Sequence, residues 1–243
     1  MFFSAAVSFA DNKLTVTVLL CEEGDEAEHY DAYNKMPPFM TALAEENNWD
    51  LHIIKSRKYA EMPSLKILDK TDVFVIYVRR IALPKDEMER VKNYVEKSGK
   101  GLVCIRTACH GFHVGGEYPE TCEDWKGFDQ KVLGGNYHGH GTNEIGSEVW
   151  NAEEQEQSPI LKNVKPNVWH SGTSVYFNDP VAKDVTVYQY AGSSEKGKMP
   201  LTWTRTYNNT RTAYTALGYK TDFALPQFKA LILNLINWTG RRD

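Results

Sequence analysis

Short apolar runs alternate with amphipathic segments in the first half of the chain. Four runs rich in Val, Ile and Leu have the length of β-strands: residues 14–20, 49–54, 73–78 and 102–105. Two segments between them repeat apolar residues at helical spacing, one beginning near Pro37 and one running from Pro84 to just before Gly99. Alternating strands and helices predict a doubly wound, mainly parallel sheet with helices on both faces.

The second half of the chain has a different pattern. Between Ile145 and Leu217, Val, Tyr, Thr and Trp are frequent and the helical period is lost. The strands expected here include Val168–Phe177, Val185–Tyr190, Leu201–Tyr207 and Thr212–Leu217. Some of them are expected to be antiparallel additions at the sheet edge, and residues 226–238 carry a final amphipathic helix. The predicted fold class is therefore α/β and flavodoxin-like, with additional antiparallel strands in the C-terminal half.

The first ten residues, MFFSAAVSFA, are apolar or small and stand directly before a polar segment. Ser8 and Ala10 have the small-x-small arrangement of a signal-peptide cleavage site, so we interpret residues 1–10 as a signal-peptide remnant. Residues 11–243 contain no repeat or linker and are expected to form one domain. On this interpretation the protein is periplasmic or secreted. If residues 1–10 are instead an ordinary N-terminal segment, it is cytoplasmic.

Composition narrows the classes of partner. The 243 residues carry a formal net charge of -4, and Lys and Arg are scattered among acids rather than gathered in a stripe. Nucleic-acid binding is not expected, because it depends on basic groups that displace counterions from phosphates. No apolar run approaches the roughly 20 residues of a membrane-spanning helix. The four cysteines are too few for a disulfide scaffold, although Cys109 and Cys122 could pair in an oxidising compartment.

A glycine-rich segment is the strongest local candidate for a functional site. LGGNYHGHG, residues 133–141, contains four glycines that allow tight turns and close approach of a ligand. His138 and His140 are two positions apart and point the same way if the segment is extended. They could transfer protons near neutral pH or bind a metal. The alternative is a structural turn whose histidines bond backbone carbonyls.

A second candidate follows residues 102–105, at the end of a strand where a doubly wound sheet presents side chains to ligands. Arg106 directly follows this strand and would occupy the position of a nucleophile elbow. Arginine is no nucleophile, but it can clamp a carboxylate or polarise an oxygen. His110 and His113 lie just beyond it. The structural alternative is a surface loop with incidental histidines.

A third candidate, His29, ends an acidic segment after the first strand. In this topology its loop lies beside the loop after residues 102–105, so His29 could converge with His110 or His113 and with His138 or His140. The predicted metal ligands are His29, His113 and His140. Three imidazoles and a carboxylate would suit zinc or another divalent metal. The predicted catalytic residues are His138, His140, Arg106 and His110.

Several motifs in order resemble the ThuA-like (trehalose utilisation) family. They are the first-strand loop ending in His29, GKGLVCIR at 99–106, LGGNYHGH at 133–140, TSVY at 173–176, MPLTWTR at 199–205 and RTAYTALGY at 211–219. They run over nearly the whole chain, and as an ordered set they are specific. The family's fold is similar to that of class I glutamine amidotransferases. Substrate binding is assigned on this resemblance to His29, Gly135, Tyr137, Trp203 and Tyr219.

The resemblance implies a small carbohydrate-derived ligand from disaccharide or 3-keto-glycoside metabolism. The sequence departs from the family at two imidazoles. The family often has His at the position of Arg106, and its Leu-Gly-His pattern is Leu217-Gly218-Tyr219 here. The glycine-x-cysteine-x-glycine elbow of amidotransferases is absent, which argues against glutamine hydrolysis.

The predicted function is that of a hydrolase or lyase acting on a disaccharide-derived or 3-keto sugar, with His acid/base groups or a His-bound metal. Two alternatives stay open. Cys109-His110-Gly111 resembles the elbow of PfpI-type peptidases, although the strand ends near Ile105, too early to place Cys109 on the elbow. The aromatic content of 12% and the loss of an imidazole at Tyr219 instead favour a non-catalytic sugar-binding or accessory protein.

Overall fold

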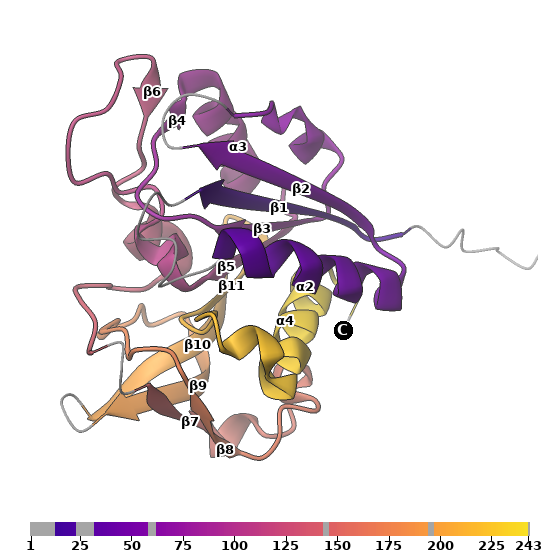
Figure 1. The fold of residues 1–243 in the computed structure, drawn as a ribbon, viewed down its shortest axis with the longest axis vertical. Helices are drawn as coiled ribbons and strands as arrows, with labels where there is room; N and C mark the ends of the chain where they lie inside the picture. The colour runs from indigo at the N-terminus through magenta and orange to yellow at the C-terminus, as the bar shows by residue number, and fades with distance from the viewer. Residues whose placement is uncertain (1–12, 23–31, 58–61, 143–145, 194–196, 243) are drawn as a thin grey trace, which may run out of the picture.

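A mixed sheet of nine strands lies at the centre of the computed structural model, which describes residues 13–22, 32–57, 62–142, 146–193 and 197–242 (Figure 1). Five neighbouring strands are parallel: β2 (Asp50–Arg57), β1 (Thr15–Glu22), β3 (Val73–Tyr77), β5 (Gly101–Ile105) and β11 (Thr210–Thr215). Four more continue the sheet with antiparallel pairing: β10 (Gly197–Tyr207), β9 (Thr186–Ser193), β7 (Ser147–Asn151) and β8 (Val168–Ser171). The order confirms the predicted α/β class with antiparallel strands from the C-terminal half.

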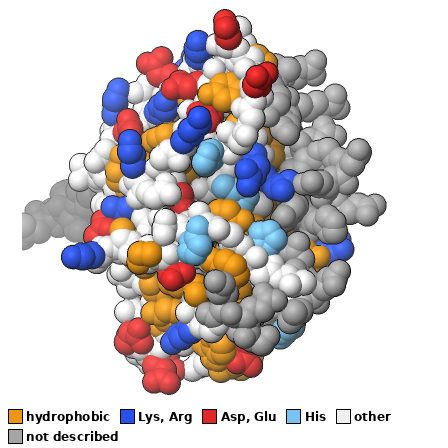
Figure 2. All heavy atoms as spheres, turned by 90° about the vertical axis from the view of Figure 1, so that its left-hand side faces the viewer, with side chains coloured by type: hydrophobic (Ala, Val, Ile, Leu, Met, Phe, Trp, Pro, Cys, Tyr) orange, Lys and Arg blue, Asp and Glu red, His pale blue; other side chains and the backbone are white. Residues whose placement is uncertain are grey.

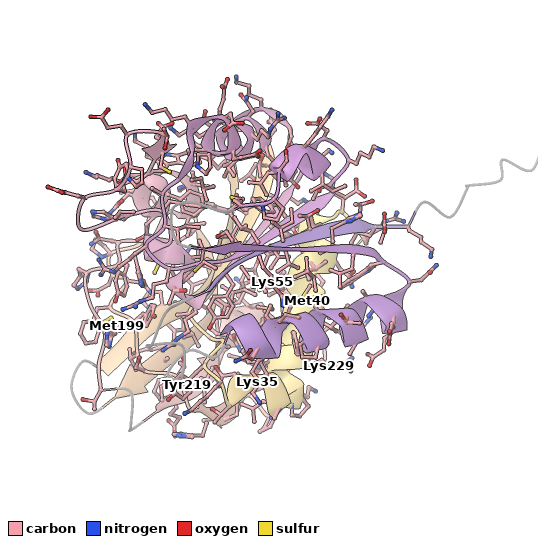
Figure 3. All side chains as sticks on the ribbon, turned by 45° about the horizontal axis from the view of Figure 1, so that its top comes forward. Lys35, Met40, Lys55, Met199, Tyr219 and Lys229 are labelled. Carbon is pink, nitrogen blue, oxygen red and sulfur yellow. The ribbon has the colours of Figure 1, made fainter. Side chains whose placement is uncertain are left out.

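Three long helices cover the sheet. They are α2 (Ala32–Asn47), α3 (Lys85–Lys97) and α4 (Pro226–Thr239). Helices α2 and α4 pack on the same face, where the rings of Phe39 and Phe228 stack with centroids 5.4 Å apart, and α3 lies on the other side of the sheet (Figure 1). Figure 3 shows Met40 between α2 and the sheet, in agreement with its complete burial. Helices therefore lie on both faces of the parallel half, as the doubly wound pattern predicts.

The first helix begins earlier than the sequence indicates. It starts at Ala32, so that Pro37 and Pro38 lie inside it rather than in its first turn. These prolines have no N–H to bond the preceding turn. Met36 and Leu43 on the same helix are nevertheless fully buried, so packing of this face outweighs the local cost of the prolines.

The antiparallel half is also more elaborate than expected. Strand β7 was not among the expected strands, and the expected strand 168–177 ends at Ser171, after which Tyr176 makes only an isolated bridge with His140. Strand β11 lies inside the sheet, parallel to β5, rather than at the edge. A separate two-stranded sheet joins β4 (Leu83–Pro84) to β6 (Cys122–Glu123).

The core follows the continuous apolar runs of the parallel strands. Every residue of β3 and β5 is buried, as expected for central strands with helices on both faces. None of the helices in the described ranges is long and apolar enough to cross a bilayer. Cys109 and Cys122 are both buried free thiols. The predicted signal-peptide remnant, residues 1–10, lies outside the described residues.

Candidate functional site

The turn after β5 has the strained geometry of an elbow. Strand β5 ends at Ile105 and the chain enters a short 3-10 helix, Arg106–His110, with φ of 49° at Arg106. A left-handed conformation is costly for a residue with a Cβ. The side chain of Arg106 holds it in place by donating to the hydroxyl of Thr173 and, at 3.3 Å, to the carbonyl of Ala216. Its guanidinium carbon also lies 4.8 Å from the ring centre of Tyr176.

Arg106 therefore occupies the elbow position that the sequence predicts. Its burial disfavours the predicted catalytic role, which stays a prediction. The side chain is 0% exposed and lies beneath the site, so it cannot touch a ligand in this conformation. Its guanidinium group donates hydrogen bonds to Thr173 and Ser174 and so connects the elbow to the segment that carries them.

A pocket of about 470 Å³ opens beside the elbow, at the carboxyl ends of the parallel strands. Figure 2 views this end of the molecule and shows histidine side chains gathered near its middle, beside Lys and Arg side chains. The lining residues are Arg80, Cys109, His110, His113, Lys126, Asp129, Gln130, Tyr137, His138, Gly139 and His140. Four of the predicted histidines, from two separate sequence motifs, thus surround one pocket.

The imidazole of His110 is nearly enclosed within this pocket. It stacks on Tyr137 with ring centroids 4.5 Å apart, and its Nδ1 lies 3.2 Å from Sγ of Cys109. Burial, together with the positive charges of Arg80, Arg79 and Arg106, lowers the pKa of His110 to about 3. The ring is therefore neutral at physiological pH.

The two histidines of the glycine-rich segment lie at the rim. Nδ1 of His138 is 2.8 Å from the carbonyl of Asn136, and Nδ1 of His140 is 2.8 Å from the carbonyl of Gly141. Because a carbonyl can only accept, each Nδ1 donates a proton to it, and Nε2 is the ring nitrogen that remains for other partners. These bonds are the structural role that the sequence left open. They also fix the tautomer that leaves Nε2 able to accept a proton.

Asp129 is a pocket residue that sequence reasoning missed. It begins a π-helical turn, Asp129–Leu133, and is 5% exposed. Its Oδ2 accepts the backbone N–H of Tyr137 at 2.7 Å, while Oδ1 has no hydrogen-bond partner within the described ranges. Burial raises the pKa of Asp129 to about 6. Its only sequence signal is an acid shortly before Gly134-Gly135, which is too common to single out.

This geometry can be compared with known proteins. The sequence model of the family described as ThuA, trehalose utilisation, matches residues 17–239. The chain belongs to the ThuA family. No curated protein matches the chain significantly.

Solved structures share the ThuA-like fold at low sequence identity. A ThuA-like protein from Bacteroides uniformis ATCC 8492 is 16% identical, with a TM-score of 0.68 over 97% of this chain and 95% of that chain. One from Parabacteroides merdae ATCC 43184 is 14% identical, with a TM-score of 0.67 over 95% and 91%. A β-galactosidase from Bacillus circulans sp. alkalophilus is 17% identical, with a TM-score of 0.61 over 93% of this chain and 31% of the galactosidase. These similarities show the fold.

The predicted substrate-binding residues of this ThuA protein do not all lie at the pocket. Tyr137 lines the pocket, and Gly135 lies directly behind Asp129, where a Cβ would come within 2.5 Å of Oδ1. Trp203 is 1% exposed and donates from its indole to the carbonyl of Leu133 at 2.7 Å, which disfavours the predicted contact with substrate. Tyr219 lies in the segment after β11 and packs over Arg106, 5.4 Å from the guanidinium carbon, and is not among the residues that line the pocket.

The predicted metal site stays a prediction. Among the described residues, no group of three or more His, Cys, Asp or Glu side chains is arranged to hold a metal ion. His113 and His140 line the same pocket, but His29, the third predicted ligand, lies outside those residues.

The chemistry of Cys109 disfavours a thiol nucleophile. The residue lies in the 3-10 helix beyond the elbow, as the early end of β5 predicts, and its side chain is 4% exposed. Burial and the nearby carboxyl of Asp129 raise the pKa of the Cys109 thiol well above its usual value. A protonated, enclosed thiol is a poor nucleophile.

Proposed function

We propose that this ThuA-family protein is an acid/base enzyme, a hydrolase or lyase, that cleaves a disaccharide-derived sugar such as a 3-keto-glycoside. The pocket with four histidines carries the proposal. At its rim, Nδ1 of His138 and Nδ1 of His140 each donate to a backbone carbonyl, so Nε2 is the nitrogen of each ring that can exchange a proton with a bound sugar. Cleavage of a glycosidic bond needs such proton transfers, which typically contribute ~10²–10⁴ in rate.

The shape of the pocket supports a sugar ligand. About 470 Å³ lies within the range of small-ligand sites, which is ~300–1,000 Å³. The partly exposed ring of Tyr137 offers an apolar face, and the surrounding side chains are hydrogen-bonding groups. The family's description, trehalose utilisation, points to the same ligand class. So do the names of two structural relatives, a β-galactosidase and a carbohydrate deacetylase.

Two further properties belong to the proposal. The apolar start of the chain supports a periplasmic or secreted location. A divalent metal such as zinc is a candidate cofactor, because His113 and His140 line the same pocket and imidazole nitrogen is a common ligand of zinc.

The proposal is tested by turnover. Purified protein is incubated with trehalose and with 3-ketotrehalose, with chelator or with added Zn²⁺, and released monosaccharide is quantified. We expect cleavage of the keto sugar, reduced at least ~100-fold in His140→Gln. The matched control is His52→Gln, on β2, whose partner is Asp50. Absence of turnover under every metal condition, with thermal stabilisation by the same sugars, would instead identify a non-catalytic binding protein.

A further inference from the structure

A second cavity lies on the antiparallel half of the sheet and shares no lining residue with the histidine pocket. Its volume is about 510 Å³. The lining residues are Trp150, Asn151, Glu153, Glu154, Glu156, Asn167, Val168 and Lys198. One aromatic ring, several carboxylates and two amides meet here on strands β7, β8 and β10 and on the turn that follows β7.

The indole of Trp150 forms the floor. Its cross-strand partners are Val168 on β8 and Tyr190 on β9, so the three side chains share one sheet face. Gly192 makes room for the indole, because a Cβ there would come within 2.7 Å of Cη2 of Trp150. Trp150 is only partly buried, and Val168 beside it is 48% exposed. The result is an apolar platform open to solvent.

Charged side chains form the walls. Nζ of Lys198 lies 4.0 Å from the ring centre of Tyr190, which holds this ammonium group against the platform. Burial and the negative charge of Glu154 raise the pKa of Tyr190, which places that carboxylate near the same ring. The carboxylates of Glu153 and Glu154 make no hydrogen bond or ion pair with any described residue. These carboxylates are therefore available as acceptors in the cavity that Trp150 lines.

We propose that this cavity is a second saccharide-binding site, selective for neutral hexose units. The C–H face of a pyranose ring packs on Trp150, and its hydroxyls donate to the carboxylates of Glu153 and Glu154. Three carboxylates against one ammonium group repel phosphorylated or carboxylated sugars and nucleic acids. The site serves to hold saccharide.

A protein partner is the competing occupant, because β8 is the last strand of the described sheet. The cavity favours a sugar. Val168 is the one strongly exposed large hydrophobic residue in the described ranges, whereas stable protein interfaces are built around an apolar core depleted of charge.

The test is an NMR titration of the whole protein with trehalose, maltose and glucuronate. The indole signal of Trp150 is followed in the wild type, and the backbone amide signals of β7 and β8 are followed in the wild type and in every variant. We expect the two neutral sugars to shift these signals with millimolar affinity and glucuronate to bind at least ~10-fold more weakly. Trp150→Ala should weaken this binding at least ~10-fold, and Glu154→Gln should weaken it while leaving the fold intact. The matched control is Trp49→Ala, because Trp49 precedes β2 at the opposite end of the sheet.

The outcome does not depend on turnover in the histidine pocket, since His140→Gln should leave the Trp150 shift unchanged. An unmoved Trp150 signal at about 50 mM trehalose and maltose would overturn the proposal. So would sugar binding that Trp150→Ala does not alter. A change of oligomeric mass in Trp150→Ala, measured by light scattering with sugar binding intact, would show that this face holds a second protein chain instead.

Discussion

The imidazole of His110 lies against the ring of Tyr137, with centroids 4.5 Å apart and planes inclined by 23°. This contact joins the elbow after β5 to the glycine-rich segment, which are about 30 residues apart in the sequence. It also excludes water from the imidazole, and burial is the largest cause of the lowered pKa of His110. The elbow and the glycine-rich segment, which are separate motifs in the sequence, are therefore one structural unit.

Tyr137→Ala should raise the pKa of His110 from about 3 toward the ordinary value of 6.5, because the imidazole becomes hydrated. The measurement is an NMR pH titration of the His110 ring proton in both proteins. Tyr207→Ala, which removes a ring on β10 outside the pocket, is the control and should leave the titration unchanged. An unaltered His110 titration in Tyr137→Ala would show that the stack does not shield the ring.

Arg106→Lys should destabilise the fold by about 2–4 kcal/mol, because a single ammonium group cannot make the contacts to Thr173, Ser174 and Ala216 together. The backbone strain at φ 49° is the same for both side chains, so the difference reports on the guanidinium. Urea denaturation measures it. The control is Arg90→Lys, whose half-exposed side chain pairs with Glu87 at 3.5 Å and should contribute little. Equal losses in the two variants would contradict a structural role for Arg106.

Gly135→Ala should cost about 1–3 kcal/mol in stability, because its Cβ would lie 2.5 Å from Oδ1 of Asp129 and 3.1 Å from Cζ2 of Trp203. Thermal and urea denaturation give the change. Gly116→Ala is a matched control, since a Cβ there meets no atom within 4 Å. A stable Gly135→Ala protein would mean that the carboxyl of Asp129 moves freely, and its position behind the pocket would not be fixed.

The parallel half and the elbow were predictable because their signals are local. Continuous apolar runs mark β3 and β5 as central strands, and chain order places Arg106 directly after β5. The burial of Arg106 and Trp203 was not predictable, because burial is a tertiary property. Polar or aromatic residues near a site motif look the same in the sequence whether they line a pocket or support it.

Two further features, the position of β11 and the role of Asp129, also depend on tertiary structure. The position of β11 between β5 and β10 depends on pairing between segments about 100 residues apart, which no local pattern encodes. Asp129 acquires its chemistry only because the chain after Leu133 turns back and covers it with Gly135 and Tyr137. An isolated aspartate before two glycines carries no such information.

The buried carboxyl of Asp129 should make stability depend on pH in a direction opposite to that of a salt-bridged acid. Its pKa rises from 3.8 to about 6 on folding, so the native state binds this proton more tightly than the unfolded chain. The stabilisation is complete below about pH 4 and is lost as the pH rises through about 6, which amounts to roughly 3 kcal/mol. Asp129→Asn keeps an oxygen that accepts the N–H of Tyr137 but cannot ionise. The variant should therefore lose none of this stability as the pH rises.

Urea denaturation of wild type and Asp129→Asn between pH 4 and 8 measures the difference. We expect the free energy of unfolding of the variant to increase relative to that of the wild type as the pH rises. The difference between the two proteins should level off above about pH 7. The lowered pKa of His110 acts in both proteins and cancels from the comparison. Asp86→Asn, an exposed acid in the first turn of α3, is the control and should follow the wild-type curve. Parallel curves for wild type and Asp129→Asn would show that Asp129 ionises as freely in the folded protein as in the unfolded chain.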